Sequence, residues 1–268
     1  MRFLICTFVA VGFLASAVAA GERVQIISPQ TPDGPAAYGV AKLTKAISGR
    51  GVAVSSAQTI RRTDGHHVIV AGFSTQRHVA DLITASGLAL PEQPESLAVC
   101  HIRDAGRSTV VLCGSDAVGL MYAALDTAQR IGWAAPGEDV FTHVRNTSES
   151  PCMTDRSVST YTMQRRLFEQ RLYDESYWRQ YFDMLTASRI NSYVIIFGYE
   201  NGGFMAPIYP YFFDVEGFPD VELYGITGEQ QAKNTAALQR LIELAHERGI
   251  RFSAGIWDHI YRGGVQGG

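Results

Sequence analysis

Asn191-Ser-Tyr-Val-Ile-Ile-Phe197 and Arg251-Phe-Ser-Ala-Gly-Ile256 are the two segments that decide the fold class of this chain. Each is a short run of mainly apolar residues, and a helical pattern that opens at Thr227 and stops at Gly249 lies between them. A nearly continuous apolar strand is typical of a parallel sheet that is covered on both faces. With the alternating segment 157–163 and a further helical pattern before Asn191, the chain here predicts the order strand, helix, strand, helix, strand.

A second α/β pattern precedes these strands, from residue 21 to about residue 150. The predicted strands are 24–27, 67–71, 97–103 and 108–112, the last two as a hairpin around Asp104-Ala-Gly106. The predicted helices are 36–48, one capped by Ser74 and ending at Gly87, and one from Gly114-Ser-Asp116 to Gly132. The segment 136–151 is rich in Pro, Gly, Asn and Ser, so we place a domain boundary there.

The predicted fold class is therefore α/β: a small α/β accessory domain over 21–150, followed over 155–268 by the first strands of an incomplete (β/α)8 (TIM) barrel. A complete barrel of this kind needs about 250 residues. A free-standing sheet of three strands would leave its last strand as an exposed edge. We therefore expect a fragment in which the barrel continues beyond Gly268. The alternative is a complete, small flavodoxin-like unit.

The amino terminus has the pattern of a secretory signal peptide. Met1-Arg2 is followed by an apolar run, Phe3 to Leu14, and then by small residues up to Ala20. The run is short for a bilayer span, which takes ~20 residues, although a membrane anchor is the alternative. We expect cleavage near Ala19 or Ala20, a secreted or periplasmic protein over residues 21–268, and no membrane association after cleavage.

Composition and motifs exclude several classes of function. The net charge is −3 and no Lys/Arg-rich block occurs, so we expect no nucleic-acid partner. No Cys-x-x-Cys or His-x-x-x-His spacing occurs, so we expect no structural metal and no cofactor. The segment Gly114–Gly119 lacks the Lys-Ser/Thr of a phosphate loop and is interpreted as a tight turn with a helix cap. Cys100 and Cys113 lie on the two arms of the hairpin; export permits a disulfide, but two small buried side chains are the favoured interpretation.

An aromatic residue and a carboxylate follow each of the two apolar strands: Tyr199 and Glu200 after the first, Trp257 and Asp258 after the second. In parallel α/β architectures the ligand lies beyond the carboxyl ends of the strands. An aromatic face for a sugar ring beside a carboxylate for its hydroxyls indicates a carbohydrate site, with the aromatic loop Phe204–Phe213 as its rim. Three interpretations of the carboxylates stay open: an acid/base pair for glycoside hydrolysis, ligands of sugar hydroxyls, or structural ion pairs.

Four segments carry a family resemblance: Cys100-His-Ile-Arg103, Val110-Val-Leu112, Gly114-Ser-Asp116 and Gly119-Leu-Met-Tyr-Ala-Ala-Leu125. They resemble the small α/β domain that precedes the catalytic barrel in family 20 β-N-acetylhexosaminidases and family 67 α-glucuronidases. The segment 248–259 resembles the third barrel strand of the hexosaminidases, which implies a sugar-contacting role for Asp258. Ile256 stands where that family has a glutamate. The resemblance also implies that the paired catalytic carboxylates follow the fourth strand or later, beyond this chain.

We therefore expect a fragment of an exported glycoside hydrolase that acts on the glycosidic bonds of an oligo- or polysaccharide. Its catalytic residues are not identified, and this chain alone is expected to be inactive. Tyr199, Glu200, Trp257 and Asp258 would shape one wall of the sugar subsite. The rival interpretations are a non-catalytic carbohydrate-binding or surface protein with an incomplete barrel, and a polysaccharide-degrading enzyme of another reaction type on the same scaffold.

Overall fold

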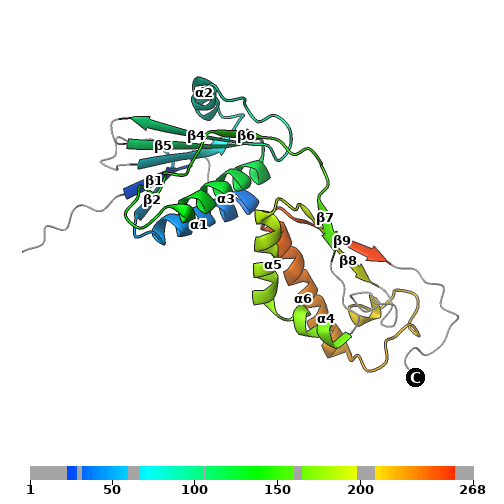
Figure 1. Cartoon of the computed structure of the whole chain (residues 1–268). Helices are drawn as coiled ribbons and strands as arrows, with labels where there is room; N and C mark the ends of the chain where they lie inside the picture. Colours follow the sequence, from blue (N-terminus) through cyan, green and yellow to red (C-terminus); the bar gives the residue numbers. More distant parts are fainter. Residues whose placement is uncertain are drawn as a thin grey trace, which may run out of the picture.

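The computed structural model describes residues 23–28, 32–59, 67–104, 107–159, 165–197 and 209–256. These residues form two sheets, one of six strands and one of three (Figure 1). We call residues 23–149 the first unit and residues 157–256 the second unit. The α/β class expected from the sequence is confirmed.

The first unit holds six strands and three helices. They are β1 (Arg23–Ile27), α1 (Gly34–Ser48), β2 (Ala53–Ala57), β3 (His67–Phe73), α2 (Arg77–Ala85), β4 (Leu97–Asp104), β5 (Arg107–Gly114), α3 (Ala117–Trp133) and β6 (Thr147–Glu149). The strand order is β2-β1-β3-β5-β4-β6. All neighbouring pairs are parallel except those that involve β4, which runs antiparallel to both β5 and β6.

Helices cover both faces of this sheet, with α1 and α3 side by side on one face and α2 on the other (Figure 1). The larger apolar core lies between the sheet and the α1–α3 pair. A smaller core that includes Val79 and Ile83 of α2 fills the opposite face. The two helices α1 and α3 touch through their backbones, because a Cβ atom on Gly39 would lie 2.7 Å from Cα of Met121.

The loops around β5 differ in one point from the sequence prediction. The Asp116 side chain accepts a hydrogen bond from the Gly119 N–H at 2.8 Å, so the predicted turn and helix cap at the start of α3 are confirmed. The predicted cap of α2 is wrong: the helix begins at Arg77 with Gln76 as its cap. The Ser74 N–H is bonded to the Gly114 carbonyl at 2.9 Å, which holds Ser74 at the end of the sheet.

Cys100 and Cys113 are free, buried thiols in the smaller core. The hairpin register pairs Cys100 with Val111 and Cys113 with Ala98, so the two cysteines are diagonal neighbours. Diagonal positions lie ~7–8 Å apart, too far for the usual disulfide geometry. Burial raises the pKa of the Cys113 thiol to about 12. The interpretation as small buried side chains is confirmed, and the disulfide alternative is wrong.

The second unit contains a smaller, fully parallel sheet. Its elements are β7 (Ser157–Ser159), α4 (Arg165–Leu172), α5 (Glu175–Ala187), β8 (Ser192–Phe197), the 3-10 turn η1 (Tyr209–Tyr211), α6 (Gly228–His246) and β9 (Arg251–Ile256). The strands lie in the order of the chain, β7-β8-β9. Asp174 caps α5 by accepting from the Tyr177 N–H at 2.9 Å, and Thr227 caps α6 by accepting from the Gln230 N–H at 3.2 Å. The predicted order of strands and helices is confirmed, and α4 is an additional helix.

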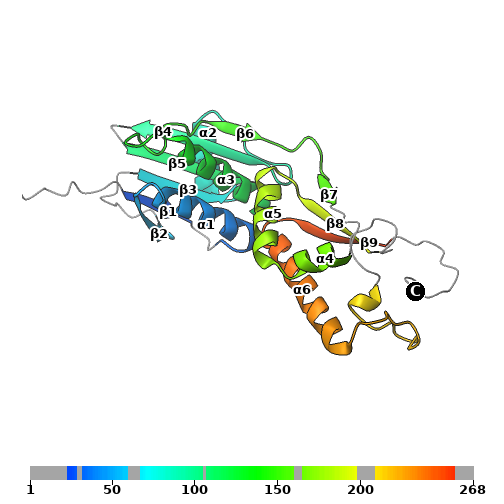
Figure 2. The same cartoon turned by 60° about the horizontal axis from the view of Figure 1, so that its bottom comes forward.

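Sequential parallel strands joined by right-handed crossovers carry their helices on one face. Figures 1 and 2 show α5 and α6 next to each other beside β8 and β9. Tyr193 of β8 points to this side, with its ring 5.8 Å from the Trp178 ring and 5.6 Å from the Phe182 ring. On the other face, Ser159 and Ser253 flank Val194 and are exposed. Among the described residues the helices thus lie on one face of this sheet and the strands follow the order of the chain, whereas a flavodoxin-like sheet has helices on both faces.

Across the described helices, none is long and apolar enough to span a bilayer.

Candidate functional site

The carboxyl ends of β8 and β9 form one edge of the second sheet. The two strands are parallel, and their last residues, Phe197 and Ile256, are register partners. The predicted site residues follow these two positions in the sequence. Tyr199, Glu200, Trp257 and Asp258 themselves lie outside the described residues, so their side chains stay a prediction. The paired ends of β8 and β9, which precede these residues, form the strand edge that the sequence predicts.

The aromatic loop before α6 differs from the predicted rim. Tyr211 and Phe212 are buried, with exposed fractions of 0% and 2%. Both rings pack edge-to-face against Phe168 of α4, at centroid distances of 6.2 Å and 6.4 Å. The Asn234 amide of α6 donates to the Tyr211 carbonyl at 2.8 Å and fixes the turn. These two rings therefore belong to the apolar core and not to a rim, because they fill the space between α4 and α6.

Exposed aromatic residues occur further along the same connection. Phe213, Phe218 and Tyr224 have exposed fractions of 55%, 63% and 93%. They lie between β8 and α6, in a βα connection, and such connections build the substrate sites of (β/α)8 barrels. The signal that could have singled out Phe218 and Tyr224 is their alternation with carboxylates in the segment 214–224. A rim built from this connection would use these residues.

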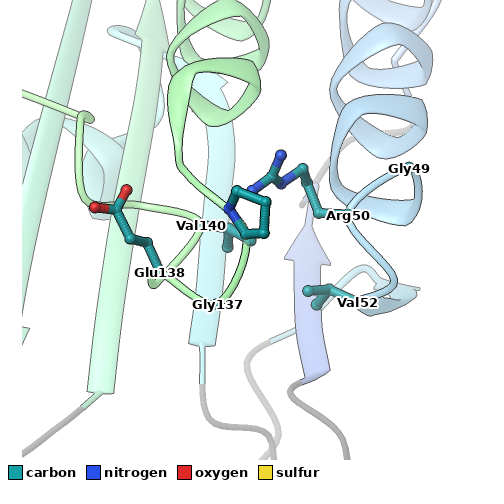
Figure 3. Close-up of a pocket in the computed structure, with 7 residues that line it drawn as sticks. Gly49, Arg50, Val52, Gly137, Glu138 and Val140 are labelled. Atoms are coloured by element: carbon teal, nitrogen blue, oxygen red, sulfur yellow. The ribbon is translucent and has the colours of Figure 1, made fainter.

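Two hollows lie on the first unit. One, of about 420 Å³, lies between the turn after α1 and the loop after α3 (Figure 3). Its two charged side chains hold the loop in place: Arg50 donates to the Ala135 carbonyl at 2.8 Å, and Glu138 accepts from the Ala135 N–H at 2.7 Å. Figure 3 shows these two side chains on separate sides of the hollow. Arg50 and Glu138 thus already have hydrogen-bond partners in the loop.

The second hollow, of about 740 Å³, lies beside the carboxyl ends of β1 and β2, and its described lining is uncharged. Among the described residues, neither lining combines two carboxylates, which glycoside hydrolysis ordinarily requires. Within the described ranges, no group of three or more His, Cys, Asp or Glu side chains is placed to hold a metal ion. The edge at the ends of β8 and β9 therefore remains the candidate site.

No protein-family model and no curated protein sequence matches the chain. Solved structures of glycoside hydrolases do match its fold. A GH138 enzyme targeting pectin rhamnogalacturonan II aligns with a TM-score of 0.65 and 14% identity over 89% of this chain and 32% of that chain. CpGH84D aligns with a TM-score of 0.58 and 11% identity over 92% of this chain and 36% of that chain. CpGH84B aligns with a TM-score of 0.52 and 12% identity over 87% of this chain and 33% of that chain.

The chain thus spans about a third of the length of these enzymes, and each alignment extends over most of the chain. At 11–14% identity the likeness concerns the fold. The arrangement of a mixed six-stranded sheet followed by sequential parallel strands is therefore an α/β fold shared with glycoside hydrolases.

Proposed function

We propose that this chain is the opening part of an exported glycoside hydrolase: a small α/β accessory domain followed by the first three strands of a (β/α)8 catalytic barrel. The observation that carries the proposal is the second sheet. Its strands are sequential and parallel, its helices lie on one face, and the ends of β8 and β9 are paired at one edge. Closed barrels repeat this unit eight times and place the active site at that edge.

The proposed substrate is a carbohydrate, held at the ends of β8 and β9. Tyr199 and Trp257 would stack on sugar rings, and Glu200 and Asp258 would accept hydrogen bonds from sugar hydroxyls. The acid and base that cleave the glycosidic bond would come from later strands of the longer enzyme. In support, the structural neighbours are glycoside hydrolases about three times as long as this chain.

Export is the part of the proposal that rests on the sequence of the first 20 residues. If the signal peptide is cleaved, the protein recovered from a secreting host begins at Ala20 or Gly21. Intact-mass measurement of the recovered protein decides this point. A mass that still includes residues 1–20 would refute cleavage.

Sugar binding is tested with the chain extended to its full reading frame. The probes are chito-oligosaccharides, glucuronoxylan and rhamnogalacturonan II, offered in affinity electrophoresis and then in calorimetry. For the bound probe, Asp258→Ala should weaken affinity by about 1–3 kcal/mol, because partner hydroxyls lose their acceptor, while stability hardly changes. Glu200→Ala should act in the same way.

The matched control is Asp155→Ala. Asp155 is an exposed carboxylate that pairs with Arg251 at 2.8 Å, at the amino end of β9, so its loss should leave sugar binding unchanged. Equal affinities of the Asp258→Ala variant and the unmodified protein would remove the proposed site. Binding without hydrolysis of any probe by the full-length protein would favour the non-catalytic carbohydrate-binding role.

A further inference from the structure

The amino ends of all three strands of the second sheet contact the first unit. Arg156 directly precedes β7, Asn191 directly precedes β8, and Arg248–Ile250 directly precedes β9. Arg156 and Asn191 are bonded to Glu95 of the first unit. Arg248 is paired with Asp183, which is in turn bonded to Tyr38 of the first unit. We infer that the first unit clamps the amino ends of β7, β8 and β9 and thereby positions their carboxyl tips, with Glu95 and Asp183 as the positioning residues.

Asn191 joins the three strands to one another. Its side-chain oxygen accepts from the Arg156 N–H at 2.9 Å, and its backbone carbonyl accepts from the Arg251 N–H at 2.9 Å. Its amide nitrogen donates to Glu95 at 2.7 Å and to the Thr154 carbonyl at 2.9 Å. The residue is 1% exposed, and its oxygen and nitrogen are both bonded. A shift of Asn191 would therefore shift the starts of all three strands.

Glu95 holds this junction from the first unit. One carboxylate oxygen accepts from Asn191, and the other forms an ion pair with the Arg156 guanidinium. Arg156 also lies within 3.4 Å of the Tyr122 hydroxyl of α3. The side chains of Arg156 and Glu95 are 13% and 20% exposed, so solvent screens the pair only in part.

The backbone of Glu95 has a φ of +62°, in the left-handed region that favours glycine. Its N–H is fixed by the Asp116 carboxylate at 2.8 Å, the same side chain that caps α3. A non-glycine residue persists in this conformation where its surroundings over-determine it. Here the carboxylate binds Asn191 of the second unit and Arg156, the residue directly before that unit, and glycine has no side chain that could make these contacts.

Asp183 of α5 forms the second contact group. It accepts from the Tyr38 hydroxyl at 2.8 Å and pairs with Lys42, both on α1, and it accepts from Arg248 at 2.7 Å. The Arg248 guanidinium lies 4.8 Å from the centre of the Tyr38 ring and is 4% exposed. A buried guanidinium is stable only with a partner for its charge. Asp183 therefore ties the residue that leads into β9 to α1 of the first unit.

Gly249, the next residue, completes the contact. A Cβ atom there would lie 3.0 Å from Val118 and 3.3 Å from Met121 of α3. The chain thus enters β9 in close contact with the first unit. Polar contacts and close packing act together on the amino ends of β8 and β9.

The geometry explains why a distant clamp matters for the tips. A strand of six residues, such as β8 or β9, is ~20 Å long at ~3.3 Å per residue. A tilt of about 5° at its base then moves its tip by about 2 Å. Misplacement by about 1 Å can cost an enzyme about a hundredfold in rate. Only this consequence rests on the proposed sugar site; the clamp itself does not.

Amide hydrogen exchange of the intact chain, without ligand, tests the inference. The variants are Glu95→Ala and Asp183→Ala, each with a milder partner, Glu95→Gln and Asp183→Asn. Loss of charged hydrogen bonds should speed exchange in β8 and β9 by roughly tenfold to a hundredfold, while β1 and β3 stay within about twofold. The milder substitutions should fall between their alanine partners and the unmodified chain. Glu149→Ala is the control, because Glu149 also reaches the second unit, through Arg189 at 3.2 Å, but its side chain is 52% exposed.

The pattern of the exchange separates positioning from general stability. A merely structural role would speed exchange in both sheets to the same degree, because only global opening would change, and that result would overturn the inference. Unchanged exchange in β8 and β9 would also overturn it. If the alanine variants do not fold, the same comparison of exchange rates between the two sheets is made with Glu95→Gln and Asp183→Asn. Sugar affinity of the same variants reports separately on the proposed function, since exchange is measured without sugar.

Discussion

The two units of this chain build parallel sheets in different ways. The first unit covers both faces of its sheet, with α1 and α3 on one side and α2 on the other, and it has a core on each face. The second unit places its helices on one face, and Ser159 and Ser253 are exposed on the other. The first sheet thus has an apolar core on each face, whereas the described core of the second unit lies on its helical face.

The difference shows where the stability of the second unit comes from. Its helical side has a core of its own, centred on Trp178, Phe182, Tyr193 and Phe212. The amino ends of its strands are held by contacts with the first unit through Glu95 and Asp183. The buried Asn191 amide has Glu95 of the first unit as a hydrogen-bond partner, and Asp183 has Tyr38 and Lys42. A buried polar group that loses its partners destabilises the fold. The first unit is therefore a support for the second as well as a domain beside it.

The strongest test of this comparison separates the units. Residues 21–150, expressed alone, should unfold in one sharp thermal transition, because their cores are self-contained. Residues 155–268, expressed alone, should be molten or aggregate, since they lack Glu95, which binds Arg156 and Asn191, lack Tyr38 and Lys42, which bind Asp183, and leave a strand edge unpaired. Calorimetry and near-UV circular dichroism of each fragment decide this. A sharp transition from the second fragment would mean that the second unit is self-sufficient.

Tight packing of the first unit is tested at Gly39. Its Cβ would lie 2.7 Å from Cα of Met121 and 3.0 Å from the Met121 carbonyl oxygen, so Gly39→Ala should force α1 and α3 apart and lower the free energy of unfolding by about 3 kcal/mol. Gly132→Ala in α3 is the matched control. A Cβ at Gly132 would have no atom within 4 Å, so alanine should stabilise the helix by up to about 1 kcal/mol. Equal stabilities of the two variants in urea titrations would show that the helices can adjust.

The sequence predicts the apolar framework of both units. Elements with clear apolar periodicity, such as α3 with Leu120, Ala124, Thr127 and Ile131 all buried, lie where the pattern places them. Three of the strands and helices, β2, β6 and α4, escape prediction because few or none of their described side chains are buried. β2 has the sequence Ala-Val-Ser-Ser-Ala and pairs only with β1 at the edge of the sheet. In α4 three of eight residues are arginine, and among its described side chains only Phe168 and Leu172 are buried.

The candidate site is predictable in its frame but not in its details. The hydrophobic strands and the rule that parallel strands end at one edge place the tips after Phe197 and Ile256 together. The burial of Tyr211 and Phe212 could not be foreseen, because it depends on α4, a helix that has no sequence signal of its own. The contacts of Glu95 with Arg156 and Asn191 join residues far apart in the chain. Such polar contacts between units leave no local pattern.

The contact between the units is tested at Asp183. Asp183→Asn should lower the free energy of unfolding of the second unit by about 2 kcal/mol at neutral pH, because the buried Arg248 loses its charged partner at 2.7 Å and keeps only the more distant Glu247 at 3.4 Å among the described residues. Asp81→Asn is the control, since Asp81 pairs with Arg77 at 3.8 Å and its side chain is 72% exposed. Urea titrations of the two variants give the difference. If both lose the same small amount, Asp183 does not join the units.

The stability difference between the unmodified chain and Asp183→Asn should also depend on pH. Burial acts to raise the pKa of Asp183, but hydrogen bonds from Lys42, Arg248 and Tyr38 outweigh it and hold this pKa below its usual value. A carboxyl whose pKa is lowered by folding stabilises the protein above its unfolded pKa of about 3.9, and this contribution is lost as pH falls through the folded pKa. The stability difference between the unmodified chain and Asp183→Asn should therefore be constant from pH 7 to about pH 5 and shrink below about pH 4. A difference that grows on acidification would contradict the assignment.

The smallest effect is expected at Arg189, the exposed contact between the units. Its guanidinium lies 3.2 Å from Glu149 and 4.9 Å from the centre of the Tyr122 ring, and its φ is +62°. In Arg189→Gly, loss of a solvent-exposed ion pair costs about 0–1 kcal/mol, and relief of the left-handed backbone returns about 1 kcal/mol. The free energy of unfolding should thus change by less than about 0.5 kcal/mol, with the backbone carbonyl of residue 189 still accepting from Arg156. A loss as large as that of Asp183→Asn would mean that exposed and buried contacts hold the second unit equally, and that the support is spread over the whole contact surface and not concentrated at Glu95 and Asp183.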